Sequence, residues 1–564
     1  MRQPEPVVTP RYARLRAWVP ILAWLPSYQR ADLPADLRAG LTTAVMLVPQ
    51  AMAYAMLAGL PPIHGLYAAS FPLIAYAVFG SSRQLAVGPV AMDSLLVAVG
   101  VGALATVGTE TYVGYAIMLA AMVGVIQIGL GLVHAGFLVN FLSRPVISGF
   151  TSAAALLIAL SQLEHLLGGD PLRDGANLPT LAIGLASVAI LVALAKLKPT
   201  APRALVVVVL GTVVVWLANL DELGVAIVGS VPRGLPRPGL PSLDLAAARA
   251  LLPTAVAIAF VSFMEAIAVA KAVAGRTKVA PNRELIGLGA ANLVAGLVRG
   301  YPIAGGLSRT AVNAQAGART GLAGIVTGAL VVLTLVLLTP LFHYLPKAVL
   351  AAIIMTAVFG LVDFAMVRRL WKVERSELAM LALTFAATLA LGIVEGIAVG
   401  VLASMLWFVI RQTRPHMAVL GQLPGTTVYR KLEHFPDAAT HPGVLAVRFD
   451  SQFYFGNVDF LERTLEALLE AGDARGEPVR AIVIDASAIN RLDSSADAAL
   501  QELHASLGEA GVRLYFASVK GPVREIMRRS GLHERLGERR FWLTVHDAVL
   551  AAERDAGRGD LQPI

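Results

Sequence analysis

The chain has 564 residues, of which 56% are hydrophobic and 15% charged, and its mean hydropathy is +0.68. Soluble proteins of this length are rarely so apolar, so the composition excludes an ordinary soluble protein and predicts a membrane protein with many spans. The net charge of +8 fits basic cytoplasmic loops better than a nucleic-acid partner, and the absence of cysteine excludes disulfides and thiolate metal sites.

Residues 1–38 are predicted to form a cytoplasmic segment before the first apolar run. This segment contains arginines and prolines but no cleavable signal peptide, and an interfacial helix is expected at Ala17–Leu25. These features favour a multi-pass protein of a bacterial inner membrane.

Apolar runs recur from about Gly40 to Ile410 and predict a transmembrane domain at residues 39–411. Basic residues such as Lys196 and Lys198 follow even-numbered runs, whereas acidic residues such as Asp221 gather after odd-numbered ones, which places both ends of the domain in the cytoplasm. We expect about fourteen spans, at 40–58, 63–80, 90–106, 112–132, 144–163, 178–196, 203–219, 251–273, 284–299, 307–316, 320–339, 346–362, 377–392 and 394–411.

The first span carries Gln50 and Tyr54, whose spacing of four residues places them on one helix face. A glutamine amide is costly in hydrocarbon, so Gln50 is expected to face the interior. There it can hydrogen-bond an oxyanion while Tyr54 walls the pocket. Packing between helices through the same side chains is an equally supported interpretation.

Two interrupted segments occupy matching positions in the two halves of the domain. Leu85–Ala91 contains a Gly-Pro pair and begins the third span, and Tyr301–Asn313 contains a proline and two adjacent glycines and begins the tenth. A separation of seven spans predicts two inverted repeats whose broken helices meet at a site.

Arg309 lies in the second of these segments, at membrane depth. An arginine there is expensive unless it faces protein or a water-filled cavity. The short helix expected from Leu307 points its free N–H groups and positive dipole end into the cavity beside Ser308, and Arg309 adds a full positive charge. These features predict an anion site. The competing interpretation is a re-entrant loop whose arginine binds carbonyl groups.

Two carboxylic acids are expected within the membrane, Glu265 in the eighth span and Asp93 in the third. Burial penalises the ionised form of Glu265, whereas a nearby arginine favours it, so its protonation can follow changes in its surroundings. We therefore expect proton coupling at Glu265, with a permanent structural partner of Arg309 as the alternative. Asp93 is a secondary candidate, because it lies one turn beyond Pro89 and can instead satisfy local backbone donors.

The composition changes sharply after Arg414. Residues 412–440 are predicted as a linker, 441–555 as a cytoplasmic α/β domain, and 556–564 as a tail. Strands are expected at 444–449, 452–455, 479–485 and 512–517, and helices at 458–469, 494–507, 522–530 and 545–554. Ser494 lies at a helix start, where a phosphate is favoured, although a plain helix cap without regulation is the preferred interpretation. No motif predicts a metal or another cofactor.

Several stretches of the chain resemble the sulfate permease (SulP) family. They are Gly40–Tyr67, Phe79–Arg83, Val87–Ala91 and Gly305–Asn313, and the C-terminal region resembles a STAS domain. The resemblance implies fourteen helices in a seven-plus-seven inverted repeat, divided into a core and a gate domain. It also implies elevator-type alternating access, a homodimer, and an anion held between the starts of spans three and ten. It assigns proton or cation coupling to Glu265 and substrate binding to Gln50, Tyr54, Val90, Ala91, Ser308 and Arg309.

Two residues depart from the family's pattern. Sodium-coupled bicarbonate carriers of this family have Asp followed four residues later by Thr in span eight. Here the pair is Glu265 and Val269, which lacks a hydroxyl ligand for a hard cation, so we favour protons over sodium. Ala496 replaces the glycine of the STAS regulatory motif, which weakens the case for phosphorylation of Ser494.

The sequence thus predicts a secondary transporter, not an enzyme, that moves a small oxyanion by proton symport, with sulfate as the default substrate. The alternatives are an anion exchanger, a sodium-coupled bicarbonate or C4-dicarboxylate carrier of the same fold, and a membrane-anchored STAS signalling protein. The expected partners are the anion, the proton, the lipid bilayer, a second copy of the chain, and a cytoplasmic protein bound to the STAS domain.

Overall fold

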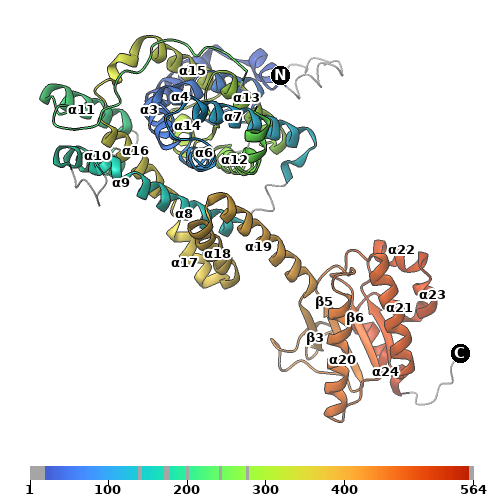
Figure 1. The fold of residues 1–564 in the computed structure, drawn as a ribbon. Coiled ribbons are helices and arrows are strands. Elements are labelled where there is room, and N and C mark those ends of the chain that lie inside the picture. Colours follow the sequence, from blue (N-terminus) through green and yellow to red (C-terminus); the bar gives the residue numbers. More distant parts are fainter. Residues whose placement is uncertain are drawn as a thin grey trace. The chain divides into compact units, whose positions relative to one another are not determined.

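The computed structural model describes residues 19–137, 143–169, 177–198, 202–240, 244–274 and 279–557. The chain divides into two compact units, Met1–Ser404 and Met405–Ile564 (Figure 1). Residues 1–18 of the predicted N-terminal segment and residues 558–564 of the predicted tail lie outside the described residues. Where an interfacial helix is expected at Ala17–Leu25, the structure has the short helix α2 at Ile21–Trp24.

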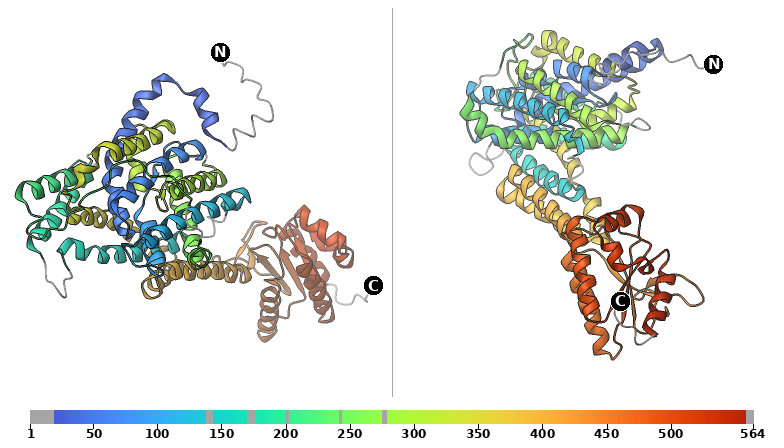
Figure 2. Two further views of the ribbon diagram at one scale, coloured as in Figure 1. Left: turned by 45° about the horizontal axis from the view of Figure 1, so that its top comes forward. Right: turned by 90° about the vertical axis from the view of Figure 1, so that its right-hand side faces the viewer.

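In its described residues, the first unit consists of helices, their connections and one short two-stranded sheet (Figures 1 and 2). Each predicted span coincides with a helix or a pair of helices, which confirms the helical membrane domain. In the described residues, eight helices are long and apolar enough to cross a bilayer, and α6, α11 and α16 are shorter apolar helices. The helices are α3 Leu33–Leu57, α4 Pro62–Ala68, α5 Phe71–Phe79, α6 Ala91–Gly102, α7 Glu110–Leu132, α8 Arg144–Ser161, α9 Leu163–Leu167, α10 Leu178–Leu197, α11 Arg203–Ala218, α12 Leu245–Val273, α13 Pro281–Leu297, α14 Leu307–Gln315, α15 Leu322–Leu333, α16 Lys347–Val358, α17 Phe364–Val373, α18 Arg375–Leu391 and α19 Ile393–Thr413.

Small residues let the helices around the centre of this unit approach closely. A Cβ atom at Gly124 of α7 would lie 2.8 Å from the carbonyl oxygen of Gly289 in α13, and a Cβ at Gly289 would lie 2.8 Å from that of Gly124. Paired glycines of this kind let two backbones come together in a membrane.

The two interrupted segments meet, as their spacing predicts. Strand β1, Val87–Gly88, pairs antiparallel with β2, Ala304–Gly305. Extended backbone leaves its hydrogen-bonding groups open inside a membrane, and this pairing satisfies part of them. Helices α6 and α14 begin directly after the two strands, so both helix starts lie at one place.

The second unit is an α/β domain, as predicted. Its six-stranded sheet has the order β4-β3-β5-β6-β7-β8, in which β5 to β8 are parallel and β3 is antiparallel to both of its neighbours. Leu461, Leu500 and Met527 belong to an apolar core on one face, and Ala548 and Ala552 of α24 to a core on the other. The elements are β3 Met417–Gln422, β4 Tyr429–Lys431, β5 Val444–Phe449, α20 Val458–Ala474, β6 Ala481–Asp485, α21 Ser494–Glu509, β7 Arg513–Ala517, α22 Gly521–Arg529, α23 Leu532–Leu536, β8 Phe541–Trp542 and α24 Val545–Gly557.

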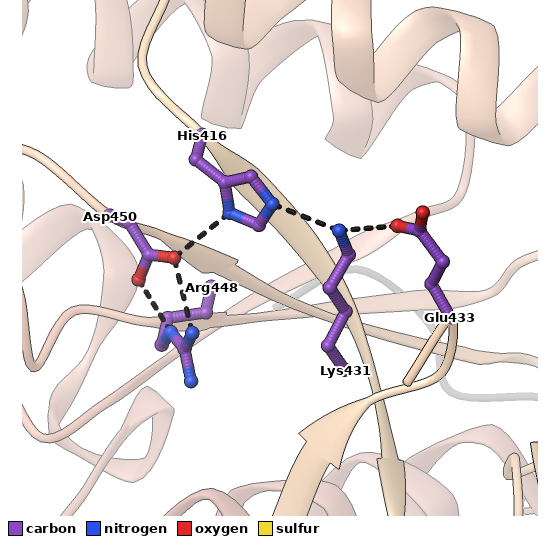
Figure 3. A network of polar contacts seen from close by, with 5 residues as sticks. All are labelled: His416, Lys431, Glu433, Arg448 and Asp450. Atoms are coloured by element: carbon purple, nitrogen blue, oxygen red, sulfur yellow. Dashed lines mark hydrogen bonds and ion pairs between the residues drawn. The ribbon is translucent and has the colours of Figure 1, made fainter. Parts of the chain in front are cut away.

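The range 412–440, predicted as a linker, instead contributes β3 and β4 to this sheet. Polar contacts join these strands to β5 (Figure 3). His416 lies between Asp450 and Lys431, with Nδ1 3.0 Å from Asp450 Oδ2 and Nε2 3.0 Å from Lys431 Nζ. Arg448 donates two hydrogen bonds to Asp450, and Lys431 also pairs with Glu433. Prolines and glycines lie between these strands, and such a composition is typical of a linker. The sequence therefore does not indicate the strand pairing.

The strand expected at 452–455 is also wrong. Only an isolated bridge between Phe453 and Leu492 forms there among the described residues. The side chain of Asn457 accepts a hydrogen bond from the N–H of Tyr454 and donates one to the carbonyl of Gln452. A side chain that satisfies the backbone locally favours a turn over a strand.

Candidate anion-binding site

The starts of α6 and α14 present backbone N–H groups to one region of the membrane unit. Val90 is the N-cap of α6 and Gly306 that of α14, and neither provides a side-chain cap. The first N–H groups of a helix have no partner within the helix, and the helix dipole adds partial positive charge there. Two such starts placed together favour a negatively charged ligand.

Arg309 supplies the full charge of this region. Its side chain is only 2% exposed, and Nη1 donates a 2.6 Å hydrogen bond to the carbonyl oxygen of Pro89, directly before α6. Nε and Nη2 are buried and have no hydrogen-bond partner among the described residues. The alternative of an arginine bound to carbonyls therefore accounts for one nitrogen only. Unpaired buried donors are costly, so the two remaining nitrogens favour an anionic acceptor.

One glycine leaves the space that the guanidinium fills, and a second glycine supplies an unusual backbone conformation beside it. A Cβ atom at Gly306 would lie 2.7 Å from Cζ and Nη2 of Arg309. Gly88 has φ +144°, and a Cβ there would lie 3.4 Å from Nη2. Glycine is the residue that tolerates both such a close approach and such a backbone conformation. The glycines noted in the sequence therefore set the position of the charge as well as interrupting the helices.

The residues expected to line the site are brought together to different degrees. Gln50 and Tyr54 of α3 are both buried, Gln50 Oε1 has no partner among the described residues, and Tyr54 lies within electrostatic range of Arg309. Val90 and Ala91 are buried at the start of α6. Ser308 differs, because its side chain is exposed at the start of α14. It borders accessible space and does not belong to the buried part of the site.

The two carboxylic acids lie near each other, and one of them lies near Arg309. Glu265 of α12 is half-buried and within electrostatic range of Arg309, but no hydrogen bond or ion pair joins them among the described contacts. Asp93 is completely buried near Glu265, and neither of its oxygens has a partner in the described part of the chain. The expectation that Asp93 can satisfy local backbone donors is therefore wrong.

A buried amide network that sequence reasoning missed holds β2 in place. Asn292 of α13 accepts a 2.8 Å hydrogen bond from the N–H of Ile303 and donates a 3.1 Å bond to its carbonyl. Asn292 also donates to Gln127 of α7, and Gln127 donates to Ser262 of α12. Amides inside apolar helices were the available signal, by the same reasoning that identified Gln50.

Other side chains fasten the two interrupted segments to each other and to their surroundings. Thr310 accepts a 3.0 Å hydrogen bond from the N–H of Ala86, and Asn313 donates to the carbonyl of Gln84. Glu284 of α13, also missed, is buried and accepts hydrogen bonds from Tyr76 and Ser81. The site is therefore held by rigid helices around it.

In the second unit, Asp493 and not Ser494 caps helix α21. The Asp493 carboxylate accepts a 2.8 Å hydrogen bond from the N–H of Ala496. Ser494 is the first residue of the helix and is exposed. It remains a candidate phosphosite that an enzyme can reach.

Residues 33–384 match the sulfate permease family, and residues 435–548 match the STAS domain. The chain belongs to the sulfate permease family. This membership confirms the resemblance seen in the motifs, and with it a helical membrane domain followed by an α/β STAS domain. A sulfate permease is an integral, multi-pass transport protein, not an enzyme.

Known proteins resemble this sulfate permease over nearly its whole length. It is 38% identical over 573 residues to the chloroplastic sulfate transporter 4.1 of Arabidopsis thaliana, covering 95% of this chain and 83% of that protein. It is 36% identical over 554 residues to a probable sulfate transporter of Mycobacterium tuberculosis, covering 95% and 98%. The structure of the murine Solute Carrier 26 family member A9 anion transporter, in its inward-facing state, matches with a TM-score of 0.87 at 26% identity, covering 98% of this chain and 97% of that one.

Proposed function

We propose that the protein carries a small oxyanion across the membrane by proton symport, with sulfate as the default substrate. The observation that carries this proposal is Arg309, which is buried where two helix starts meet and has two nitrogens without a protein partner. The relatives named as sulfate transporters support the substrate class. In this proposal the anion lies against the helix starts and the free guanidinium nitrogens, with Gln50 and Tyr54 beside it.

The charges around the site link anion binding to protons. Glu265 lies near the guanidinium and Asp93 lies near Glu265, so these three groups together are negative when both acids are ionised and positive when both are protonated. Coulomb energies between groups this close are large away from water, so an anion binds best to the protonated site. An anion and protons then enter together and leave together. Glu265 is the proposed principal proton carrier because it is half-buried and within reach of water, and Asp93 is the secondary one.

Elevator-type movement, a homodimer, cytoplasmic chain ends and a bacterial inner membrane belong to the same proposal. Family membership supports the movement and the homodimer, the basic loops support the cytoplasmic chain ends, and the Mycobacterium tuberculosis relative supports the bacterial membrane. Because the chain has no cysteine, single cysteines can be introduced and labelled without background. Membrane-impermeant labelling of a cysteine at the exposed position 308 from each side would report alternating access directly.

The test is labelled sulfate binding and uptake with the purified protein in proteoliposomes. In Arg309→Ala the anion loses at least two charge-assisted hydrogen bonds of about 1.5–3 kcal/mol each, so the Kd for sulfate should rise at least about a hundredfold. The matched control is Arg249→Ala, an exposed arginine of α12. Sulfate binding by Arg309→Ala equal to that of the unchanged protein would contradict the proposed site.

The same vesicles distinguish the remaining functions. Uptake by a symporter falls when an inward proton gradient is collapsed, whereas uptake by an exchanger persists if a counter-anion is supplied inside. A membrane-anchored signalling protein shows no flux, and Arg309→Ala changes nothing. Competition by bicarbonate and by C4-dicarboxylates then decides whether sulfate is the preferred anion.

A further inference from the structure

Helix α17 differs from the helices around it, and it lies between the spans predicted at 346–362 and 377–392. It has ten residues, Phe364–Val373, and rises about 15 Å, half of what the hydrocarbon core of a bilayer requires. Its start is well defined, because the Asp363 side chain accepts a 2.9 Å hydrogen bond from the N–H of Met366. Glu374 adopts an extended conformation and ends the helix directly before α18.

The helix has two chemically distinct sides. Phe364, Val367 and Trp371 recur at helical spacing and are 76%, 38% and 65% exposed, and we call them the apolar face. Arg368, Arg369 and Lys372 lie next to this face around the helix, are all exposed, and form the cationic edge. Within this fully described helix only Leu370 is buried. The protein therefore covers neither the apolar face nor the cationic edge.

Arg375, the first residue of α18, places a further positive charge against the apolar face. The guanidinium of Arg375 lies 5.9 Å from the centre of the Trp371 ring. A cation above an indole is favourable, and indole rings with a neighbouring cation are typical of the headgroup region of a bilayer. This arrangement suits a Trp371 ring that lies in the headgroup region, where Arg375 can contact lipid phosphates.

The connections at both ends of α17 keep it at the membrane surface. A 3₁₀ turn that continues α16 ends at Leu361, three residues before α17, and α18 begins two residues after it. Both neighbours are apolar helices of the membrane domain, so α17 has no length of chain with which to leave the bilayer surface. Its ten residues include three cationic side chains and no acidic one. Such a surface complements anionic headgroups in particular.

We propose that α17 is an anionic-phospholipid-binding element. Its apolar face inserts among the acyl chains at the bilayer surface, and its cationic edge binds the phosphates of anionic lipids. Binding holds the connection between α16 and α18 flat against the membrane. This inference does not depend on which anion the protein carries.

The first experiment locates the apolar face. The full-length variant Phe364→Cys is labelled with an environment-sensitive fluorophore and reconstituted in vesicles that contain brominated phosphatidylcholine and phosphatidylglycerol. Phe455→Cys is the matched control, a phenylalanine of almost equal exposure, 73%, in the STAS domain. We expect strong quenching at position 364 and none at position 455. No quenching at position 364, or a crosslink from it to a second copy of the chain, would overturn the proposal.

The second experiment tests the cationic edge. The full-length protein is purified from membranes that contain phosphatidylglycerol and phosphatidylethanolamine, and the retained lipids are quantified by mass spectrometry. The protein should retain phosphatidylglycerol several-fold above its share in the membrane. Arg368→Lys with Arg369→Lys should keep this enrichment, whereas Arg368→Gln, Arg369→Gln and Lys372→Gln together should abolish it. Soluble glycerol phosphate should not displace the retained lipid. Equal enrichment in the glutamine variant, or displacement by glycerol phosphate, would refute lipid binding at α17.

Discussion

Replacing Gly306 with alanine tests whether the position of the Arg309 guanidinium controls anion binding, because the substitution leaves every charge in place. Gly306 has φ −86° and ψ 123°, a conformation that alanine adopts without strain. The added methyl group therefore acts only through what it touches. It would lie 2.7 Å from Cζ and Nη2 of Arg309 and 2.9 Å from Nε.

The size of the effect follows from these distances. Ordinary contacts begin near 3.4 Å, so the guanidinium must retreat by about 0.7 Å, the difference between 3.4 and 2.7 Å. The 2.6 Å bond from Nη1 to the Pro89 carbonyl cannot follow such a shift. One charge-assisted hydrogen bond contributes about 1.5–3 kcal/mol, so misplacing the donors should raise the Kd for sulfate between roughly tenfold and a hundredfold.

The assay is equilibrium binding of labelled sulfate to the purified protein. Gly129→Ala provides the control, since it adds the same methyl group to helix α7, where nothing among the described residues lies within 4 Å. Its affinity should not change. If Gly306→Ala bound sulfate within twofold of the unchanged protein while Arg309→Ala lost binding, the guanidinium would not need the position seen in the structure, and the reasoning would fail.

Three further outcomes are expected. Glu265→Gln should reduce gradient-driven sulfate uptake to the level without a proton gradient while leaving sulfate counterflow intact, and a preserved response to the gradient would rule out Glu265 as the proton carrier. Asn292→Leu removes two hydrogen bonds to Ile303 and one to a neighbouring amide, so the protein should lose about 3 kcal/mol of stability, visible as a lower Tm, and an unchanged Tm would contradict this role. Burial acts to raise the pKa of Asp450, but the hydrogen bonds from Arg448 and His416 lower it by more than burial raises it. The net pKa of Asp450 therefore lies below its usual value. The contribution of Asp450 is therefore complete above the unfolded-state pKa of about 3.9 and is lost as pH falls through the lower folded pKa. Asp450→Asn should flatten the acid-side loss of STAS stability in thermal unfolding, and coincident pH profiles would disprove the effect.

The segment predicted as a linker contains two strands that the sequence did not predict. Segment 412–440 has short strands separated by prolines and glycines, and its apolar residues are too few to show a period. Pairing of β3 with β5, and the contacts of His416 with Asp450 and Lys431, make it part of the sheet. Strand pairing depends on partners distant in the chain, and local composition does not record them.

The sequence alone determined the helical membrane domain, the two interrupted segments and the presence of an arginine among them. A bilayer forces these features into the sequence, because each span needs a long apolar run and any break or charge within it stands out. The family motifs followed from the same stretches. Asn292 and Glu284 are also polar residues within an apolar helix, so the sequence contains the same indication of an interior position for them.

Tertiary structure alone decided which interior groups meet. The cost of a charge in hydrocarbon indicates that Arg309 faces protein or a cavity. Only packing shows that its Nη1 binds the Pro89 carbonyl while Nε and Nη2 have no partner among the described residues. Packing also leaves Asp93 without a backbone partner, exposes Ser308, and turns the apolar face of α17 outward. The physical reason is that helical spacing fixes the direction of a side chain relative to its own axis. What it touches depends on how close the neighbouring helices come, and pairs of small residues such as Gly124 and Gly289 set that distance.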